Sequence, residues 1–298
     1  VYSEFLPTRR TPPTFVLKIF ENRAAYLAYG APKTSAAYYD QSTKELVGYD
    51  TGVILGVRDI GPIVEVAQDV LLQLPQRDSQ RLVQLLDQVT DAYTMDTARI
   101  LSHEGWHQYF HMYTVSWVDM PSWLDEGVGD YFFMATLDEQ QSKAKHGYRL
   151  GDLNEIRLRT LHRALVDGTT VNFSTLLGFA QQDYYKNASV FYAQGWSMVH
   201  FLNHHESSRY RELIPKLIKD FKDTKNFKKS TEKIFKGLDM DSLDREWVGW
   251  VLSNKPPDPL RELAAEFGDR LRTEHLTAPE SVLRAYDWHL EHRAVPAR

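Results

Sequence analysis

The chain has 298 residues, of which 43% are hydrophobic and 25% are charged, and its formal net charge is −5. These values are typical of globular proteins and allow one large domain or two joined lobes. The acidic balance argues against a nucleic-acid-binding protein, which needs a basic excess or stripe. The lysines between Lys216 and Lys236 lie among helical apolar positions, so we expect them to form a solvated helix face.

Cysteine is absent from the chain, which excludes disulfides, thiolate metal sites and a cysteine nucleophile. No apolar run approaches the ~18 residues that a membrane span requires. The sequence begins VYSEFLPTRRTPP, with neither a starting methionine nor an apolar signal core. We therefore expect a processed or trimmed product, and a secreted or extracytoplasmic location is favoured.

Strand patterns dominate the first sixty residues. The alternating character of the side chains in Thr14–Phe20 predicts a strand. The segment Glu21–Pro32 predicts a short helix that ends at Gly30 and Pro32. Two β-prone pieces around a polar turn predict a hairpin within Ala36–Asp50. The apolar run Gly52–Val57 predicts a further strand, so we expect a small mixed or antiparallel sheet.

Helical patterns dominate the rest of the chain. From Val64 onward apolar residues recur at spacings of three and four, with an interruption at Pro75. Further helices are expected at Ser122–Leu137, Leu153–Val166, Phe173–Ala180, Val190–His204, Tyr210–Phe221 and Ser242–Leu252. The sequence NKPPDP at Asn254–Pro259 predicts a linker before a charged helical tail.

This organisation predicts an α+β protein in three parts. Residues 1–112 would form an α/β lobe with a small mixed sheet, and residues 113–254 a mainly helical lobe. Residues 255–298 would form the linker and a helical extension.

Three histidines and one glutamate fall within the nine residues HEGWHQYFH, from His103 to His111. His103 and His107 are four residues apart, so on a helix they share one face and their rings can converge on one ion. Zinc accepts imidazole ligands at ~2.0–2.1 Å. Glu104 lies beside this pair, where it can hold a water on the metal and take its proton. The stretch therefore predicts a zinc site that lies on a helix.

The third ligand has to be found elsewhere. One class of such sites continues to a glycine and a third histidine, but Phe110 and Tyr113 occupy those positions here. His111 would lie about 12 Å from His103 along a straight helix, at ~1.5 Å per residue. A single ion cannot span that distance, so we expect His111 to be a packed or hydrogen-bonded helix residue.

The stretch Pro121–Phe132, PSWLDEGVGDYF, offers a better ligand. Glu126 can be the third ligand, which leaves the fourth position for water, as catalytic zinc sites require. Asp130 is four residues later on the same face and can accept a hydrogen bond from the outer ring nitrogen of a histidine ligand. The alternative is that both acids form the solvated face of an amphipathic helix.

The same stretch carries signals for a helix start and for close packing. Ser122 is expected to cap the helix, with Asp125 three residues later completing a capping box. Gly127 and Gly129 each cost about 1 kcal/mol relative to alanine inside a helix. That cost is tolerable where two helices must approach closely.

The ligand types and their spacing resemble those of the gluzincin metallopeptidases. Their pattern is H-E-x-x-H, eighteen residues, a glutamate, and an aspartate four residues after it. Here eighteen residues separate His107 from Glu126, and Asp130 lies four beyond Glu126. PSWLDEGVGDYF is also similar to the P-x-W-x-x-E-G box of bacterial peptidase MA-like proteins.

This resemblance extends from the Ala36–Asp50 hairpin to Trp250 and implies a thermolysin-like, two-lobe α+β fold. It also implies one catalytic zinc ion on His103, His107 and Glu126. Asp130 would then orient His103.

A second resemblance concerns Tyr192. In gluzincin aminopeptidases of the leukotriene-hydrolase type, a tyrosine in a Tyr-x-x-Gly helix start stabilises the oxyanion, and YAQG matches that pattern. Tyr184 and Tyr185 are the alternatives, and a core role for Tyr192 is the other interpretation. No G-x-M-E-N element precedes the metal motif, so amino-terminal trimming and internal cleavage both stay open.

The leading expectation is a zinc-dependent enzyme that hydrolyses peptide bonds in a peptide or protein substrate, with Glu104 as the general base. One alternative is a binding protein that keeps the fold without turnover, although a purely structural zinc needs no base. The other is a zinc hydrolase of non-peptide amides or esters. The strand at Gly52–Val57 is a candidate edge for binding an extended peptide.

Overall fold

The computed structural model describes residues 2, 15–33, 35–50, 53–55, 75–114, 120–137, 148–257, 259, 262–263 and 265–267. It divides into two compact units, one formed by Val1–Gly52 and Asp96–Lys255, the other by Val53–Met95 and Pro256–Arg298. The lobe boundaries at residues 112 and 254 stay predictions. The predicted helical pattern at residues 64–74 and the tail beyond residue 267 lie outside the described residues.

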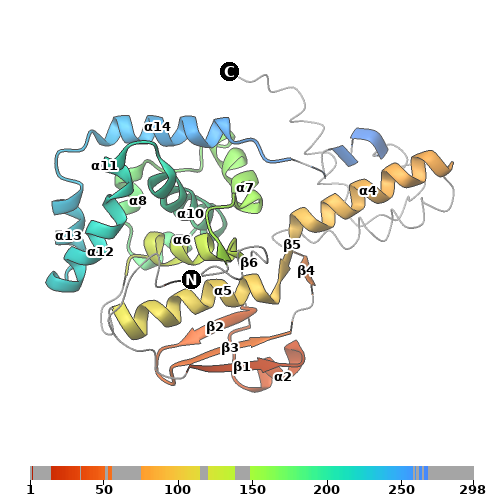
Figure 1. Cartoon of the computed structure of the whole chain (residues 1–298), viewed down its shortest axis with the longest axis horizontal. Helices are drawn as coiled ribbons and strands as arrows, with labels where there is room; N and C mark the ends of the chain where they lie inside the picture. The colour runs from red at the N-terminus through yellow and green to blue at the C-terminus, as the bar shows by residue number, and fades with distance from the viewer. Residues whose placement is uncertain are drawn as a thin grey trace. The chain divides into compact units, whose positions relative to one another are not determined.

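The first unit is a mixed α+β structure, as the sequence predicts (Figure 1). Its strands are β1 (Val16–Phe20), β2 (Ala37–Asp40), β3 (Glu45–Tyr49), β6 (Thr136–Leu137) and β7 (Tyr148–Arg149). Its helices are α2 (Arg23–Ala28), α5 (Thr97–Tyr109), the π-helical turn η1 (Phe110–Thr114), α6 (Ser122–Phe133), α7 (Glu155–Val166), α8 (Phe173–Leu177), α9 (Gln181–Tyr185), α10 (Ala188–His204), α11 (Ser208–Arg211), α12 (Leu213–Thr224), α13 (Phe227–Ile234) and α14 (Met240–Ser253).

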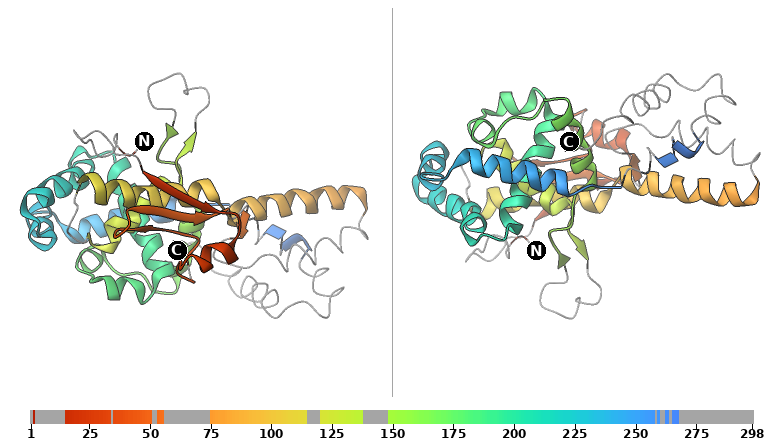
Figure 2. Two further views of the ribbon diagram at one scale, coloured as in Figure 1. Left: turned by 90° about the horizontal axis from the view of Figure 1, so that it is seen from below. Right: turned by 90° about the horizontal axis from the view of Figure 1, so that it is seen from above.

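The three-stranded sheet has the order β1-β3-β2, so that β2 is an edge strand. β2 and β3 form the predicted hairpin, and β1 pairs with β3 in parallel. Asp40 stabilises the hairpin turn, because its carboxylate accepts hydrogen bonds from the Ser42 and Thr43 amides. One side of α5 packs against this sheet and another side packs against α6, so α5 is the layer between them (Figures 1 and 2).

The core of the first unit forms where α10 packs against α6 and α7. Gly127 of α6 meets the backbone of Gly195 of α10, and a Cβ on Gly127 would lie 2.6 Å from the Gly195 carbonyl oxygen. The close helix approach predicted from the glycines is therefore present. Large aromatic side chains fill the surrounding space and are fully buried: Trp106, Trp123, Trp196, Trp247, Phe110, Phe132, Phe173, Phe201 and Phe221.

The structure corrects two details of α6. The helix ends at Phe133 rather than Leu137, because Thr136–Leu137 leaves the helix and pairs with Tyr148–Arg149. Ser122 is the first helical residue and Pro121 takes the cap position, so no side chain caps this helix. The predicted capping box is therefore wrong.

The second unit contains β4 (Val53–Leu55), the predicted amphipathic helix α4 (Gln76–Tyr93), and most of β5 (Thr94–Asp96), with which β4 pairs. Within it, the Arg81 guanidinium of α4 donates hydrogen bonds to both carboxylate oxygens of Glu266. In the part of the chain that is described, no helix is long and apolar enough to cross a membrane.

Candidate metal centre

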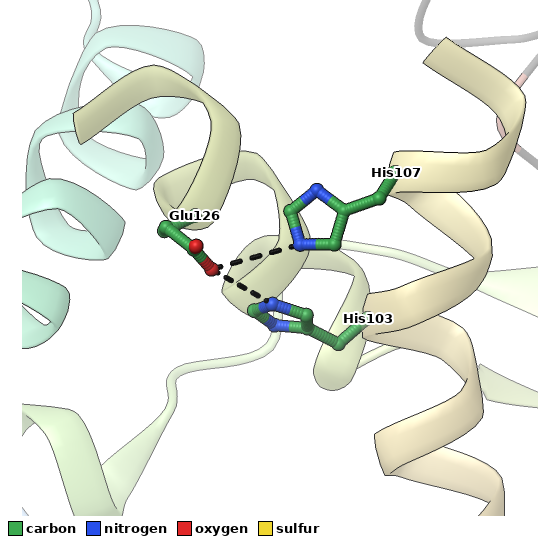
Figure 3. Close-up of side chains that lie close together, drawn as sticks. All are labelled: His103, His107 and Glu126. Carbon is green, nitrogen blue, oxygen red and sulfur yellow. Dashed lines mark hydrogen bonds and ion pairs between the residues drawn. The ribbon is translucent and has the colours of Figure 1, made fainter. Parts of the chain in front are cut away.

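Two helices of the first unit bring the three predicted ligands together (Figure 3). His103 and His107 project from α5 on one face, and Glu126 faces them from α6. Glu126 Oε2 lies 3.1 Å from His103 Nε2 and 3.6 Å from His107 Nε2. The three side chains form a cluster that could hold a metal ion.

The donor set and its spacing fit a divalent ion such as zinc. Donors at ~2.0–2.1 Å from one tetrahedral centre lie about 3.3 Å from each other. The two distances from Glu126 Oε2, 3.1 and 3.6 Å, lie on either side of that value. Two imidazoles and one carboxylate are one of the usual sets of protein ligands of a catalytic zinc, in which water or substrate takes the fourth position.

The outer nitrogen of His103 is held by Asp130, which is 2% exposed. Asp130 Oδ1 lies 3.1 Å from His103 Nδ1, which leaves Nε2 free of a proton in the neutral ring and directed at Glu126. Gly129 makes room for this ring, because a Cβ there would lie 2.7–2.9 Å from its atoms. This is the partner that the sequence predicts for His103.

Arg157 of α7 holds Asp130 in turn. Its Nε donates to Asp130 Oδ2 at 2.7 Å and its Nη2 to Asp130 Oδ1 at 3.2 Å. Burial alone would raise the pKa of Asp130, but the Arg157 charge and the bond to His103 keep that pKa below its usual value. Asp130 therefore stays ionised beside the ligand.

The outer nitrogen of His107 is held by Asp125, whose Oδ1 lies 2.9 Å from His107 Nδ1. Burial alone would raise the pKa of Asp125, yet His107 and His111 lower it to about 2. Asp125 is thus a hydrogen-bond partner of the candidate ligand His107 rather than a helix cap. His111 lies outside the ligand cluster and contacts the Gln41 amide at 3.2 Å, in keeping with the structural role expected for it.

Three tyrosines lie near Glu126. The Tyr185 hydroxyl donates to Glu126 Oε1 at 2.7 Å. Burial raises the pKa of Tyr192. The negative charge of Glu126 and a hydrogen bond between Tyr192 and Tyr185 raise it further. The Arg157 guanidinium lies 5.1 Å from the centre of the Tyr192 ring. Tyr184 is fully buried, so of the three it is the least accessible to a substrate.

Glu104 is directed toward the edge strand of the sheet. Burial raises the pKa of Glu104, and the neighbouring Glu126 adds to the rise, while the two histidines and backbone hydrogen bonding from Tyr39 lower it. The net effect is a pKa above the ordinary value for glutamate. A general base is most effective when its pKa lies near the pH at which the enzyme works, and a raised pKa brings Glu104 closer to neutral pH.

The site contains three residues whose roles sequence reasoning did not find. From the sequence, Asp125 is expected to be a capping residue rather than a partner of His107. Tyr185 is expected only as an alternative to Tyr192 for stabilising the oxyanion, and not as a partner of Glu126. Arg157 lies 27 residues from Asp130 in a different helix, and no local pattern connects the two. The signal that could have pointed to Arg157 is Asp130 itself, because an aspartate buried beside a histidine needs a cationic partner.

The metal-free protein is expected to lose stability as the pH rises from about 6.5 to about 9. Burial alone would lower the pKa of His103, but hydrogen bonds to Asp130 and Glu126 raise it from 6.5 to about 9. The folded state therefore holds this proton more tightly than the unfolded state. The resulting stabilisation is complete below the pKa that His103 has in the unfolded chain. It is lost as the pH rises through the pKa that His103 has in the folded protein.

Urea unfolding with a chelator present, repeated across this pH range, measures the effect. Zinc-saturated protein is the control, because its histidines bind the metal in their neutral form and the decline should disappear. A free energy of unfolding that stays constant or rises between these pH values in the metal-free protein would contradict the prediction.

Residues 97–221 match the model of a family described as a protein of unknown function, DUF1570. The match covers less than half of the chain, but it contains the three candidate ligands, Glu104, Asp130 and Tyr192. No curated protein and no solved structure matches the chain. The chain is thus similar, over the segment that contains the candidate metal ligands, to a family whose function is not known.

Proposed function

We propose that the protein is a zinc-dependent metallopeptidase of the gluzincin type. The observation that carries this proposal is the convergence of His103 Nε2, His107 Nε2 and Glu126 Oε2, with the partly buried Glu104 side chain next to His103 in the sequence. A zinc ion bound there would act as a Lewis acid that lowers the pKa of water and polarises a carbonyl group. The sheet with α5, and the helices from α6 onward, would correspond to the two lobes of that fold.

Glu104 would act as the general base and then as the general acid. Its carboxylate takes a proton from the attacking water and gives it to the nitrogen of the leaving amine, so that the proton count balances over the reaction. The raised pKa of Glu104 supports this assignment, because a carboxylate with an ordinary pKa is a weaker base and would take the proton from water less readily. Its position one residue from His103 supports this role, because the carboxylate would then lie beside the reacting atoms.

A peptide substrate would bind along β2, the edge strand beside Glu104. Edge strands offer unpaired amides and carbonyls, to which an extended peptide can add as a further strand. The sequence favours Gly52–Val57 for this role, but Val53–Leu55 pairs with β5 and belongs to the second unit. We favour β2 as the binding edge instead, because the backbone of Tyr39 in β2 hydrogen-bonds to Glu104, the proposed base.

Replacing Tyr192 with phenylalanine is expected to lower kcat by about 10²- to 10³-fold, the usual cost of removing one oxyanion donor. The phenol would stabilise the oxyanion only during the reaction, so zinc affinity and KM should change little. Steady-state kinetics on one cleaved peptide measures both constants. A rise in KM with an unchanged kcat would contradict the role and would indicate simple substrate binding.

Cleavage of a peptide library by zinc-loaded protein tests the proposed function. We expect cleavage at defined internal or terminal bonds, its loss with a chelator, and its return when zinc is added back. Product masses locate the cleaved bonds and so decide between trimming and internal cleavage. Zinc-loaded protein that leaves the whole library intact, while cleaving non-peptide amides or esters, would contradict the peptidase assignment.

A further inference from the structure

Glu126 presents its two carboxylate oxygens to different partners. Oε2 faces the ligand nitrogens of His103 and His107, at 3.1 and 3.6 Å. Oε1 accepts the hydroxyl hydrogen of Tyr185 at 2.7 Å. The Glu126 side chain is 12% exposed, so few water molecules can replace the phenol as the partner of Oε1.

The orientation of a carboxylate ligand decides how many positions it takes at a metal. A carboxylate can bind through one oxygen or through both, and a second bound oxygen occupies a further coordination position. A hydrogen bond to the outer oxygen favours binding through the inner oxygen alone. Tyr185 therefore has the geometry of a group that restricts Glu126 to one ligand oxygen.

We propose that Tyr185 is a positioning residue for the metal site, which holds Glu126 Oε1 away from the ion so that Glu126 binds through Oε2 alone. The fourth position then stays open for water or substrate. This inference rests on the metal site of the proposed function but not on the reaction. It also separates the roles of the two tyrosines, because Tyr192 would act on the substrate and Tyr185 on a ligand.

The three ligands then have one outer partner each. Asp130 holds His103, Asp125 holds His107 and Tyr185 holds Glu126. The two aspartates lie on α6, whereas Tyr185 belongs to the short helix α9. Tyr185 is therefore the one partner of the three that is supplied by neither of the helices carrying the ligands.

Zinc affinity of the Tyr185→Phe variant tests the proposal. Phenylalanine keeps the ring that packs against Tyr184 and Tyr192, so a change in affinity reports the hydroxyl. The side chain is 43% exposed, so we expect the variant to fold. Competition with a chromophoric chelator should show zinc binding about 10- to 100-fold weaker than in the unchanged protein, the usual effect of losing an outer partner.

Tyr184→Phe is the matched control. Tyr184 is the neighbouring tyrosine on α9, and its buried hydroxyl has no hydrogen-bond partner in the described part of the chain. Its loss should leave zinc affinity within about twofold of the original value, because no ligand is touched. Equal losses in the two variants would overturn the proposal, as would Tyr185→Phe binding zinc as tightly as the unchanged protein.

Cobalt substitution gives a spectroscopic test of the same idea. Four-coordinate Co²⁺ absorbs visible light more strongly than five-coordinate Co²⁺, so the absorption reports the number of ligands. The unchanged protein and Tyr184→Phe should give the strong absorption, and Tyr185→Phe a weaker one as Oε1 joins the ion. Identical spectra in all three would overturn the proposal, whereas absence of zinc and cobalt binding in all three would refute the metal site itself.

Discussion

Replacing Glu104 with glutamine is expected to lower kcat for peptide hydrolysis by about 10²- to 10⁴-fold, the range for loss of a general base. Glutamine has nearly the same shape but cannot accept the proton from water. Glu104 is not in the ligand cluster, so zinc should remain bound at the same stoichiometry. Steady-state kinetics and metal analysis of the same preparation measure the two properties together.

The control for this variant is Glu232→Gln, at an exposed position of α13 that is remote in sequence from the metal motif. It makes the same chemical change and should keep full activity. Activity that survives Glu104→Gln at the original level would show that another group activates the water. Loss of zinc together with activity would instead show that Glu104 maintains the site rather than acting as a base.

Replacing Arg157 with leucine is expected to lower the free energy of unfolding by about 3–5 kcal/mol, the usual cost of removing one partner of a buried ion pair. Asp130 is 3% exposed and Arg157 is 15% exposed at their side chains, so water cannot readily replace the guanidinium. The variant would leave the Asp130 charge buried, with His103 as its remaining hydrogen-bond partner among the described residues. Urea unfolding at neutral pH measures the change.

Arg149→Leu provides the comparison, because Arg149 also binds an aspartate, Asp152, at 2.7 Å. The Arg149 side chain is 62% exposed, so its removal should cost at most about 1 kcal/mol. Similar losses in the two variants would contradict the account of Asp130. The double variant Asp130→Asn, Arg157→Leu should be less destabilised than the sum of the single changes, since the two residues interact directly.

Local patterns in the sequence predicted which three side chains come together in the cluster that could hold a metal ion. The spacing of His103 and His107 specifies one helix face, and Glu126 lies on the next helix of the described structure. Gly127 was expected to mark a close approach of helices, and it meets the backbone of Gly195. These features depend on residues close in sequence, or on a spacing that helical geometry constrains.

Features that depend on packing between distant segments were not predictable in the same way. Arg157 reaches Asp130 from another helix, and Tyr185 reaches Glu126 across 59 residues. Asp125 has the spacing of a capping residue, but Pro121 occupies the cap position and the carboxylate turns to His107 instead. A local pattern cannot show which of two hydrogen-bond partners a side chain takes when one of them belongs to another helix.

The end of α6 shows the same limit. The apolar pattern continues past Phe133, and no glycine or proline marks the point where the helix stops. The chain leaves the helix there because Thr136 and Leu137 pair with Arg149 and Tyr148. Pairing with a strand eleven residues away is a tertiary effect, which can override local helix propensity.

The zinc content of the purified chain tests the central claim most directly. After equilibrium dialysis against buffered zinc, elemental analysis should find one zinc ion per chain. His107→Ala and Glu126→Ala should each bind substantially less at the same free zinc concentration, because each removes one of three ligands. A chain that does not bind zinc one to one would contradict the account, as would either variant that binds zinc as well as the unchanged protein.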